Sequence, residues 1–103
     1  MRDGQEINLA EPISAQHRGI VMHWQYYNNG VQNHNHAYFF VPKNRIDGTG
    51  VTMMGLAGSY FFKKYVYVWD EKIIGNEEND QVETLSGVQF NNNKAVLTEV
   101  LGV

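Results

Sequence analysis

The chain has 103 residues, of which 43% are hydrophobic, 13% aromatic and 18% charged, and its formal net charge is -3. This length predicts a single domain, and the aromatic content favours a folded chain over a disordered one. Lysine and arginine are scattered through an acidic sequence, so nucleic acid and membranes are not expected as partners. The absence of cysteine excludes disulfides and thiolate metal sites, and no apolar run approaches the roughly 18 residues of a membrane-spanning helix.

The first half of the chain predicts two strands joined by a turn. Residues 1–6 are expected to be a flexible N-terminus. The stretch 19–27, GIVMHWQYY, alternates between two sets of side chains with β-branched and aromatic members, which is typical of a strand. The Asn-Gly pair at 29–30 favours a tight turn, and 37–43, AYFFVPK, predicts a second strand that Pro42 ends.

The second half continues as short apolar runs broken by glycine and asparagine. The stretch 44–50, NRIDGTG, predicts a loop. The stretch 76–86 gathers several acids with few apolar residues, which predicts an exposed acidic loop. A turn at 91–94, NNNK, is expected to close a hairpin between the last two strands. Strands are expected at 51–57, 63–70, 72–75, 87–90 and 95–103.

The pattern as a whole indicates an all-β protein. No window has a long amphipathic helical period, and the best helical candidate, EPISAQ at 11–16, is short and contains a proline. Short strands separated by frequent turns are typical of sandwiches and small barrels. We therefore expect one domain over residues 1–103, an antiparallel β-sandwich or jelly-roll-like barrel of about seven to eight strands.

Two histidines, His34 and His36, stand two residues apart in NHNHAYFF, residues 33–40. On an extended chain such residues face the same way, so the pair could offer two imidazoles to one metal ion. Two ligands are too few for a closed site in one copy, and His17 and His23 stand in other segments. No metal or other cofactor is therefore expected in a single chain, although a homotrimer could gather three pairs around one axis.

No constellation of residues in the sequence is typical of an enzyme. The carboxylates Glu77, Glu78 and Asp80 lie in the expected acidic loop, which gives no cleft for glycosidic cleavage. The serines lie in no nucleophile-elbow pattern, and GTGVTMMG lacks the lysine of a phosphate loop. We therefore expect a protein that is not an enzyme. The alternative is a small jelly-roll enzyme that processes a metal or a sugar with His34 and His36.

Aromatic side chains are too numerous for one small core, because alternation along the strands places some of them on outer faces. Where they are exposed beside asparagine, glutamine or histidine, they could stack on sugars or contact another subunit. A purely structural module that associates with itself is thus a further alternative. The residues expected to bind a glycan are Trp24, Tyr26, Asn28, Asn33, His34, His36, Tyr67 and Trp69.

The order of motifs along the chain resembles that of a known family. INLAEPIS and GIVMHWQYY are followed by FFVPK, GTGVTMM, KYVYVWDEKIIGN and GVQFNNN, and the sequence closes with VLTEVLGV. From about Ile7 to Val103 this order resembles the C-terminal domain of tail and baseplate proteins of phages and prophages of Gram-positive bacteria. In that family the domain usually follows longer shaft or adaptor regions, so this sequence is expected to be a stand-alone gene product or an excised domain.

What the resemblance implies is a virion component at the distal tail, made in the bacterial cytoplasm. It implies a homo-oligomer, with a trimer favoured, that contacts other phage tail proteins and binds polysaccharide of the host cell wall. Matching positions such as Gly19, Pro42 and Gly102 imply structural roles. Receptor specificity is then expected in the loops at 28–36 and 76–86, because a rigid β scaffold carries recognition on its loops.

Overall fold

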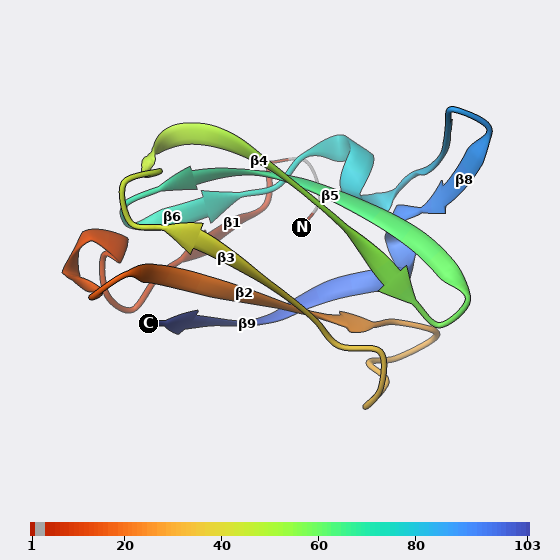
Figure 1. The fold of residues 1–103 in the computed structure, drawn as a ribbon, viewed down its shortest axis with the longest axis horizontal. Coiled ribbons are helices and arrows are strands. Elements are labelled where there is room, and N and C mark those ends of the chain that lie inside the picture. The colour runs from red at the N-terminus through yellow and green to blue at the C-terminus, as the bar shows by residue number, and fades with distance from the viewer. Residues whose placement is uncertain (2–3) are drawn as a thin grey trace.

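The computed structural model describes Met1 and residues 4–103, which form a larger sheet of six strands and a smaller sheet of three (Figure 1). The larger sheet has the order β1-β6-β5-β8-β7, with β4 paired to β5, and the smaller has the order β3-β2-β9. The expected all-β sandwich or barrel is therefore confirmed. The strands are β1 (Glu6–Asn8), β2 (Gly19–Tyr26), β3 (Ala37–Pro42), β4 (Asp47–Ala57), β5 (Tyr60–Trp69), β6 (Lys72–Ile74), β7 (Val82–Leu85), β8 (Val88–Asn91) and β9 (Ala95–Gly102).

Short 3-10 helices lie between some of these strands. No helix among the described residues has the length and apolar character needed to cross a membrane. The helices are η1 (Ile13–Ala15), η2 (Glu77–Asp80) and η3 (Asn92–Lys94).

Alternating side chains from the two sheets fill the core between them. On β2, Met22 and Trp24 are 0% exposed, and on β5 so are Val66 and Val68. Burying a side chain of this size contributes about 1.5–3 kcal/mol, so this layer supplies a large part of the stability. Further buried apolar residues are Ile13, Ile20, Val41, Met53, Ala57, Phe62, Ile73 and Ala95.

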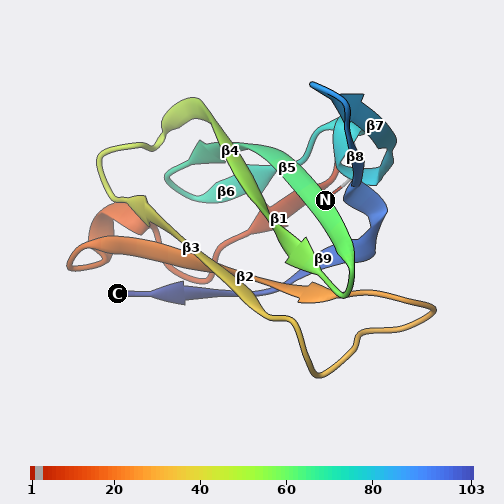
Figure 2. The ribbon, with the colours of Figure 1, turned by 45° about the vertical axis from the view of Figure 1, so that its right-hand side comes forward.

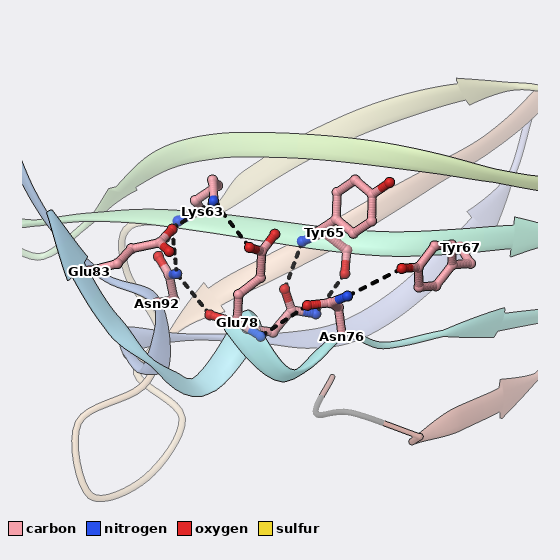
Figure 3. A network of polar contacts seen from close by, with 8 residues as sticks. Lys63, Tyr65, Tyr67, Asn76, Glu78, Glu83 and Asn92 are labelled. Atoms are coloured by element: carbon pink, nitrogen blue, oxygen red, sulfur yellow. Dashed lines mark hydrogen bonds and ion pairs between the residues drawn. The ribbon is translucent and has the colours of Figure 1, made fainter. Parts of the chain in front are cut away.

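Strand β5 is central to the larger sheet, but one of its edges is paired only near its two ends, by β6 and by β8. Between these strands, side-chain amides take the place of a neighbouring backbone (Figure 3). The Tyr65 N–H donates to Asn79 Oδ1 at 2.7 Å, and Asn79 Nδ2 donates to the Tyr65 carbonyl at 2.8 Å. The Lys63 N–H donates to Asn92 Oδ1 at 2.7 Å. Two asparagines thus satisfy backbone groups that a strand would otherwise pair.

The same asparagines fasten other segments to β5. Asn79 Nδ2 also donates to the Met1 carbonyl at 2.6 Å, and Asn92 Nδ2 donates to the Glu78 carbonyl at 2.8 Å. The Asn76 side chain caps η2 by accepting from the Glu78 N–H at 3.0 Å. Because Asn79 and Asn92 are both 0% exposed, water cannot replace these bonds.

The prediction that 76–86 is one exposed acidic loop is therefore wrong. Glu77–Asp80 form η2, with Asn79 buried beneath, and Val82–Leu85 form β7. The acids do face solvent or Lys63. The prediction failed because it rested on composition, which does not reveal that the Asn79 amide hydrogen-bonds the edge of β5. Strands β1 and β7, which the pattern did not predict, bring the number of strands to nine, against the seven to eight expected.

The expected hairpin between the last two strands is also wrong. Strand β8 pairs antiparallel with β7 and in parallel with β5, whereas β9 pairs with β2 in the other sheet. Figure 2 shows the β7–β8 hairpin at one corner of the molecule, away from β9. The NNNK turn at 91–94 becomes η3 and redirects the chain between sheets, because its Asn92 is fixed on β5.

Two boundaries also differ from expectation. The stretch 44–50 was expected to be a loop, but β4 already begins at Asp47, because Gly48 and Gly50 let the rings of β5 lie over the strand. In the expected flexible segment 1–6, Met1 is 8% exposed and Glu6 begins β1. The rest of that expectation falls partly on residues 2–3, which lie outside the described residues.

Candidate functional site

The outer face of the β3-β2-β9 sheet presents apolar side chains to solvent. Val21 on β2 is the cross-strand partner of Phe40 on β3 and of Leu101 on β9. Cross-strand partners lie on one face of a sheet, here the face opposite to that of the buried Met22. Phe40 is 53% exposed and Leu101 is 42% exposed. We call these three residues, together with His23, Tyr38 and Glu99 in the adjacent row, the outer face.

The adjacent row holds a chain of polar contacts. His23 Nδ1 lies 2.8 Å from Glu99 Oε1, and His23 Nε2 lies 2.7 Å from His36 Nδ1. Tyr38 stacks on His23, with ring centroids 4.4 Å apart and an interplanar angle of 11°. These contacts leave His23 only 6% exposed although it points away from the core. We call the chain Glu99–His23–His36 the histidine relay.

The relay fixes which ring nitrogens carry hydrogen when both imidazoles are neutral. An ionised carboxylate only accepts hydrogen bonds, so Glu99 requires a hydrogen on His23 Nδ1. His23 Nε2 is then an acceptor, which requires a hydrogen on His36 Nδ1 and leaves His36 Nε2 with a lone pair. His36 is an exposed residue, so this nitrogen can accept a hydrogen bond from a ligand hydroxyl.

Tyr38 provides a flat apolar surface beside the relay. One face of its ring is covered by His23, yet the residue is 58% exposed, so the opposite face meets solvent. A ring held in this way can stack on an apolar face of a ligand with little loss of side-chain entropy, because the stack already restricts its rotamer. The outer face therefore combines an aromatic platform with hydrogen-bonding groups at its rim.

Two of the eight residues expected to bind a glycan lie on the other sheet. Tyr67 and Trp69 belong to β5, where the Tyr67 hydroxyl accepts from Asn76 Nδ2 at 3.3 Å. Trp69 is 42% exposed and lies over Gly48. Trp24 is 0% exposed, so the expectation that it contacts a ligand is wrong: alternation along β2 puts it in the core.

The remaining expected residues gather around the 27–36 loop. Asn28, Asn33, His34 and His36 are exposed, and Tyr26 is half-buried against the core. His34 meets the Tyr26 ring edge-on, with centroids 5.4 Å apart. Five of the eight residues expected to bind a glycan thus lie at one end of the smaller sheet.

The expectation that His34 and His36 face the same way is wrong. Asn35 between them has a φ of 57°, so the segment is not extended, and β3 begins only at Ala37. His34 contacts Tyr26, whereas His36 contacts His23. Within Met1 and residues 4–103, no group of three or more His, Asp or Glu side chains is placed to hold a metal ion.

None of the six outer-face residues was in the expected glycan-binding set, and among those missed are the polar and aromatic members His23, Tyr38 and Glu99. For His23 a signal was present, because alternation along 19–27 sets it on the face opposite Trp24. Glu99 had no such signal, because it lies 76 positions from His23. A β-bulge at His23/Trp24 shifts the β2–β9 register and places Glu99 opposite His23.

A buried lysine stands apart from the outer face. Lys64 on β5 is 1% exposed, and its Nζ donates to the Asn79 carbonyl at 2.7 Å. The ammonium also lies 5.3 Å from the centroid of the Trp24 ring, a cation–π distance. Lys64 lines a cleft of about 530 Å³ beside Asp80. Burial lowers the pKa of Lys64 to about 8, and the nearby Asp80 offsets part of that effect.

The neighbouring Lys63 is paired instead of isolated. Its Nζ lies 2.7 Å from Glu83 Oε1 and 3.4 Å from Glu78 Oε2 (Figure 3). The hydrogen bond that Lys63 donates to Glu83 raises the pKa of Lys63, and the same bond lowers the pKa of Glu83. These contacts join η2 and β7 to β5 and indicate a structural role.

No known protein family, characterised protein or solved structure matches this chain.

Proposed function

We propose that this chain is a non-enzymatic domain of a phage or prophage tail or baseplate, and that its outer face binds glycan on the host cell surface. The order of motifs from INLAEPIS to VLTEVLGV supports the tail assignment. The observation that carries the binding role is the Tyr38 ring, stacked on His23 and 58% exposed beside Phe40. Sugars offer the matching surface, because their C–H faces stack on aromatic rings.

Polar groups around Tyr38 suit the hydroxyls of such a ligand. His36 Nε2 accepts a hydrogen bond when the ring is neutral, and the Glu99 side chain is 48% exposed, so its carboxylate can accept others. A site with one aromatic platform and a few convergent acceptors binds weakly on its own. Several copies on one virion would raise the avidity, because each further contact is made at high effective concentration.

In this proposal the domain works in the virion, after synthesis in the bacterial cytoplasm. Its partners are other copies of itself, with a trimer implied by the resemblance, other tail proteins, and host cell-wall polysaccharide. The loop at 28–36, which ends at His36, lies next to the outer face. Its sequence could change, and with it the specificity for the glycan, without altering the sheet.

Replacing Tyr38 with alanine should weaken binding to purified cell walls of Gram-positive bacteria by at least about tenfold, because the platform is lost. The matched control is Trp69→Ala, which removes an aromatic ring of similar exposure from the larger sheet and should leave binding unchanged. Co-sedimentation with a panel of cell walls measures both. If only Trp69→Ala lost binding, the glycan site would lie on the larger sheet and not on the outer face. If the intact chain bound no cell wall, only a structural role would remain.

A second candidate function, self-association, is favoured by a separate apolar surface on the larger sheet. Met54 and Leu56 on β4 are 56% and 54% exposed, and Phe61 on β5 is 48% exposed. With Phe90 they line a shallow cleft of about 320 Å³. A cluster of large exposed apolar side chains is typical of a contact with another protein.

A further inference from the structure

The long strand β4 lies at the border of the larger sheet. It runs from Asp47 to Ala57 and pairs along its whole length with β5. Within the described part of the chain, no strand other than β5 pairs with it. The backbone groups on its far side therefore have no strand to bind.

The register identifies these outward groups. Ala57 and Tyr60 flank the two-residue turn at 58–59 and form its hydrogen-bonded closing pair. In an antiparallel ladder the pairs alternate, so Leu56, Met54 and Thr52 turn their N–H and C=O groups away from β5. Gly50 continues the series. The same residues carry the exposed side chains of the strand.

The edge of β4 lacks the two sequence features that usually prevent pairing with another strand. From Gly48 to Ala57 the sequence has no charge and no proline. Charges and prolines are the usual means by which edge strands avoid one another. The other outermost strands carry them: Glu6 on β1, Glu83 on β7, Pro42 on β3 and Glu99 on β9.

We propose that β4 pairs antiparallel with β4 of a second copy, across a two-fold axis near Met53. In this register Thr52 lies opposite Met54 of the second copy, and Gly50 lies opposite Leu56. Each such pair exchanges two backbone hydrogen bonds, so all the outward groups of the four residues are satisfied. Because this stretch of β4 has no charged residue, two copies of it meet no electrostatic repulsion when they pair, and it offers no charge that would attract a charged partner. A second copy of the chain is therefore the partner proposed.

This contact would also cover apolar surface. Met54 of each copy lies close to the axis, next to the cleft that Leu56, Phe61 and Phe90 line. The inference rests on the second candidate function and gives it a defined surface. It predicts a dimer of the isolated chain, because an antiparallel two-fold contact closes after two copies, whereas the resemblance implies a trimer.

Sedimentation equilibrium of the whole chain between about 1 and about 100 μM, a range in which mass action populates both states, tests the inference. Wild type is expected to form a dimer. Met54→Pro removes only an outward N–H, and Met54→Lys places like charges near the axis; each should weaken dimerisation at least about tenfold. Val82→Lys, the matched control, adds the same charge at a 52% exposed position on β7 and should leave the dimer unchanged.

Circular dichroism shows whether each variant is folded. If Met54→Pro is unfolded, Met54→Lys alone tests the β4 contact. A dimer that neither Met54 variant weakens would overturn the β4 contact while leaving self-association in place. A wild type that stays monomeric at about 100 μM, or forms a trimer, would also overturn it, and the monomer would remove the second candidate function as well.

Discussion

Asn79→Ala is expected to lower the free energy of unfolding by about 3 to 5 kcal/mol, because it leaves buried backbone groups without partners at about 1–3 kcal/mol each. The Tyr65 N–H loses its acceptor, and the Tyr65 and Met1 carbonyls lose their donor. Chemical denaturation measures the change. Amide hydrogen exchange adds a local readout, because the Tyr65 N–H should lose protection more than its neighbours on β5 do.

Glu77→Ala is the control for this variant, since Glu77 is an exposed residue in the same helix η2. Its expected effect is within about 0.5 kcal/mol. If Asn79→Ala were as mild as Glu77→Ala, side-chain amides would not be completing the β5 edge, and the account of that sheet would fail.

Lys64 makes stability depend on pH in alkaline solution. Its pKa is about 8 in the folded chain, against an ordinary 10.5 when unfolded. Below pH 8 Lys64 is charged in the folded state although it is buried, which costs free energy. As the pH rises from 8 toward 10.5, Lys64 is protonated more fully in the unfolded state than in the folded state, so the free energy of unfolding increases. The contribution of Lys64 to the free energy of unfolding should therefore rise by about 3 kcal/mol from pH 7 to pH 10.5.

Lys64→Met separates this effect from tyrosines, which also titrate in that range. The difference in unfolding free energy, wild type minus variant, should increase by about 3 kcal/mol over the same interval. Denaturation of both proteins at several pH values measures it. A difference independent of pH would mean that Lys64 keeps an ordinary pKa, and so is not desolvated as its burial implies.

Alternation of side chains predicted the parts of the fold that depend on local pattern. Strands β2 and β5 were evident from it, because on each strand one alternating set of side chains enters the core. The failures came where distant contacts decide the structure. Asn79 and Asn92 read as loop residues by composition, yet each is buried and bound to β5. Strand β9 joins β2 instead of its sequence neighbour β8.

The candidate site was predictable only in part. His36 stood out because of its spacing from His34, but the partner that gives it a role is His23, in another strand. Tyr38 was assigned to a strand without any indication that its ring would stack. Glu99 joins through a bulge that no local pattern reveals. Trp24 was expected at the ligand because of its residue type, whereas its place in the alternation puts it in the core.

The central claim, that the outer face binds host glycan, is tested most directly by NMR titration of the labelled chain with soluble polysaccharide released from Gram-positive cell walls. The largest chemical-shift changes are expected at Tyr38, Phe40 and His36, and those of Tyr67 and Trp69 are expected to be near zero. Changes confined to Tyr67 and Trp69, or none at a polysaccharide concentration that saturates intact cell-wall binding, would contradict the claim.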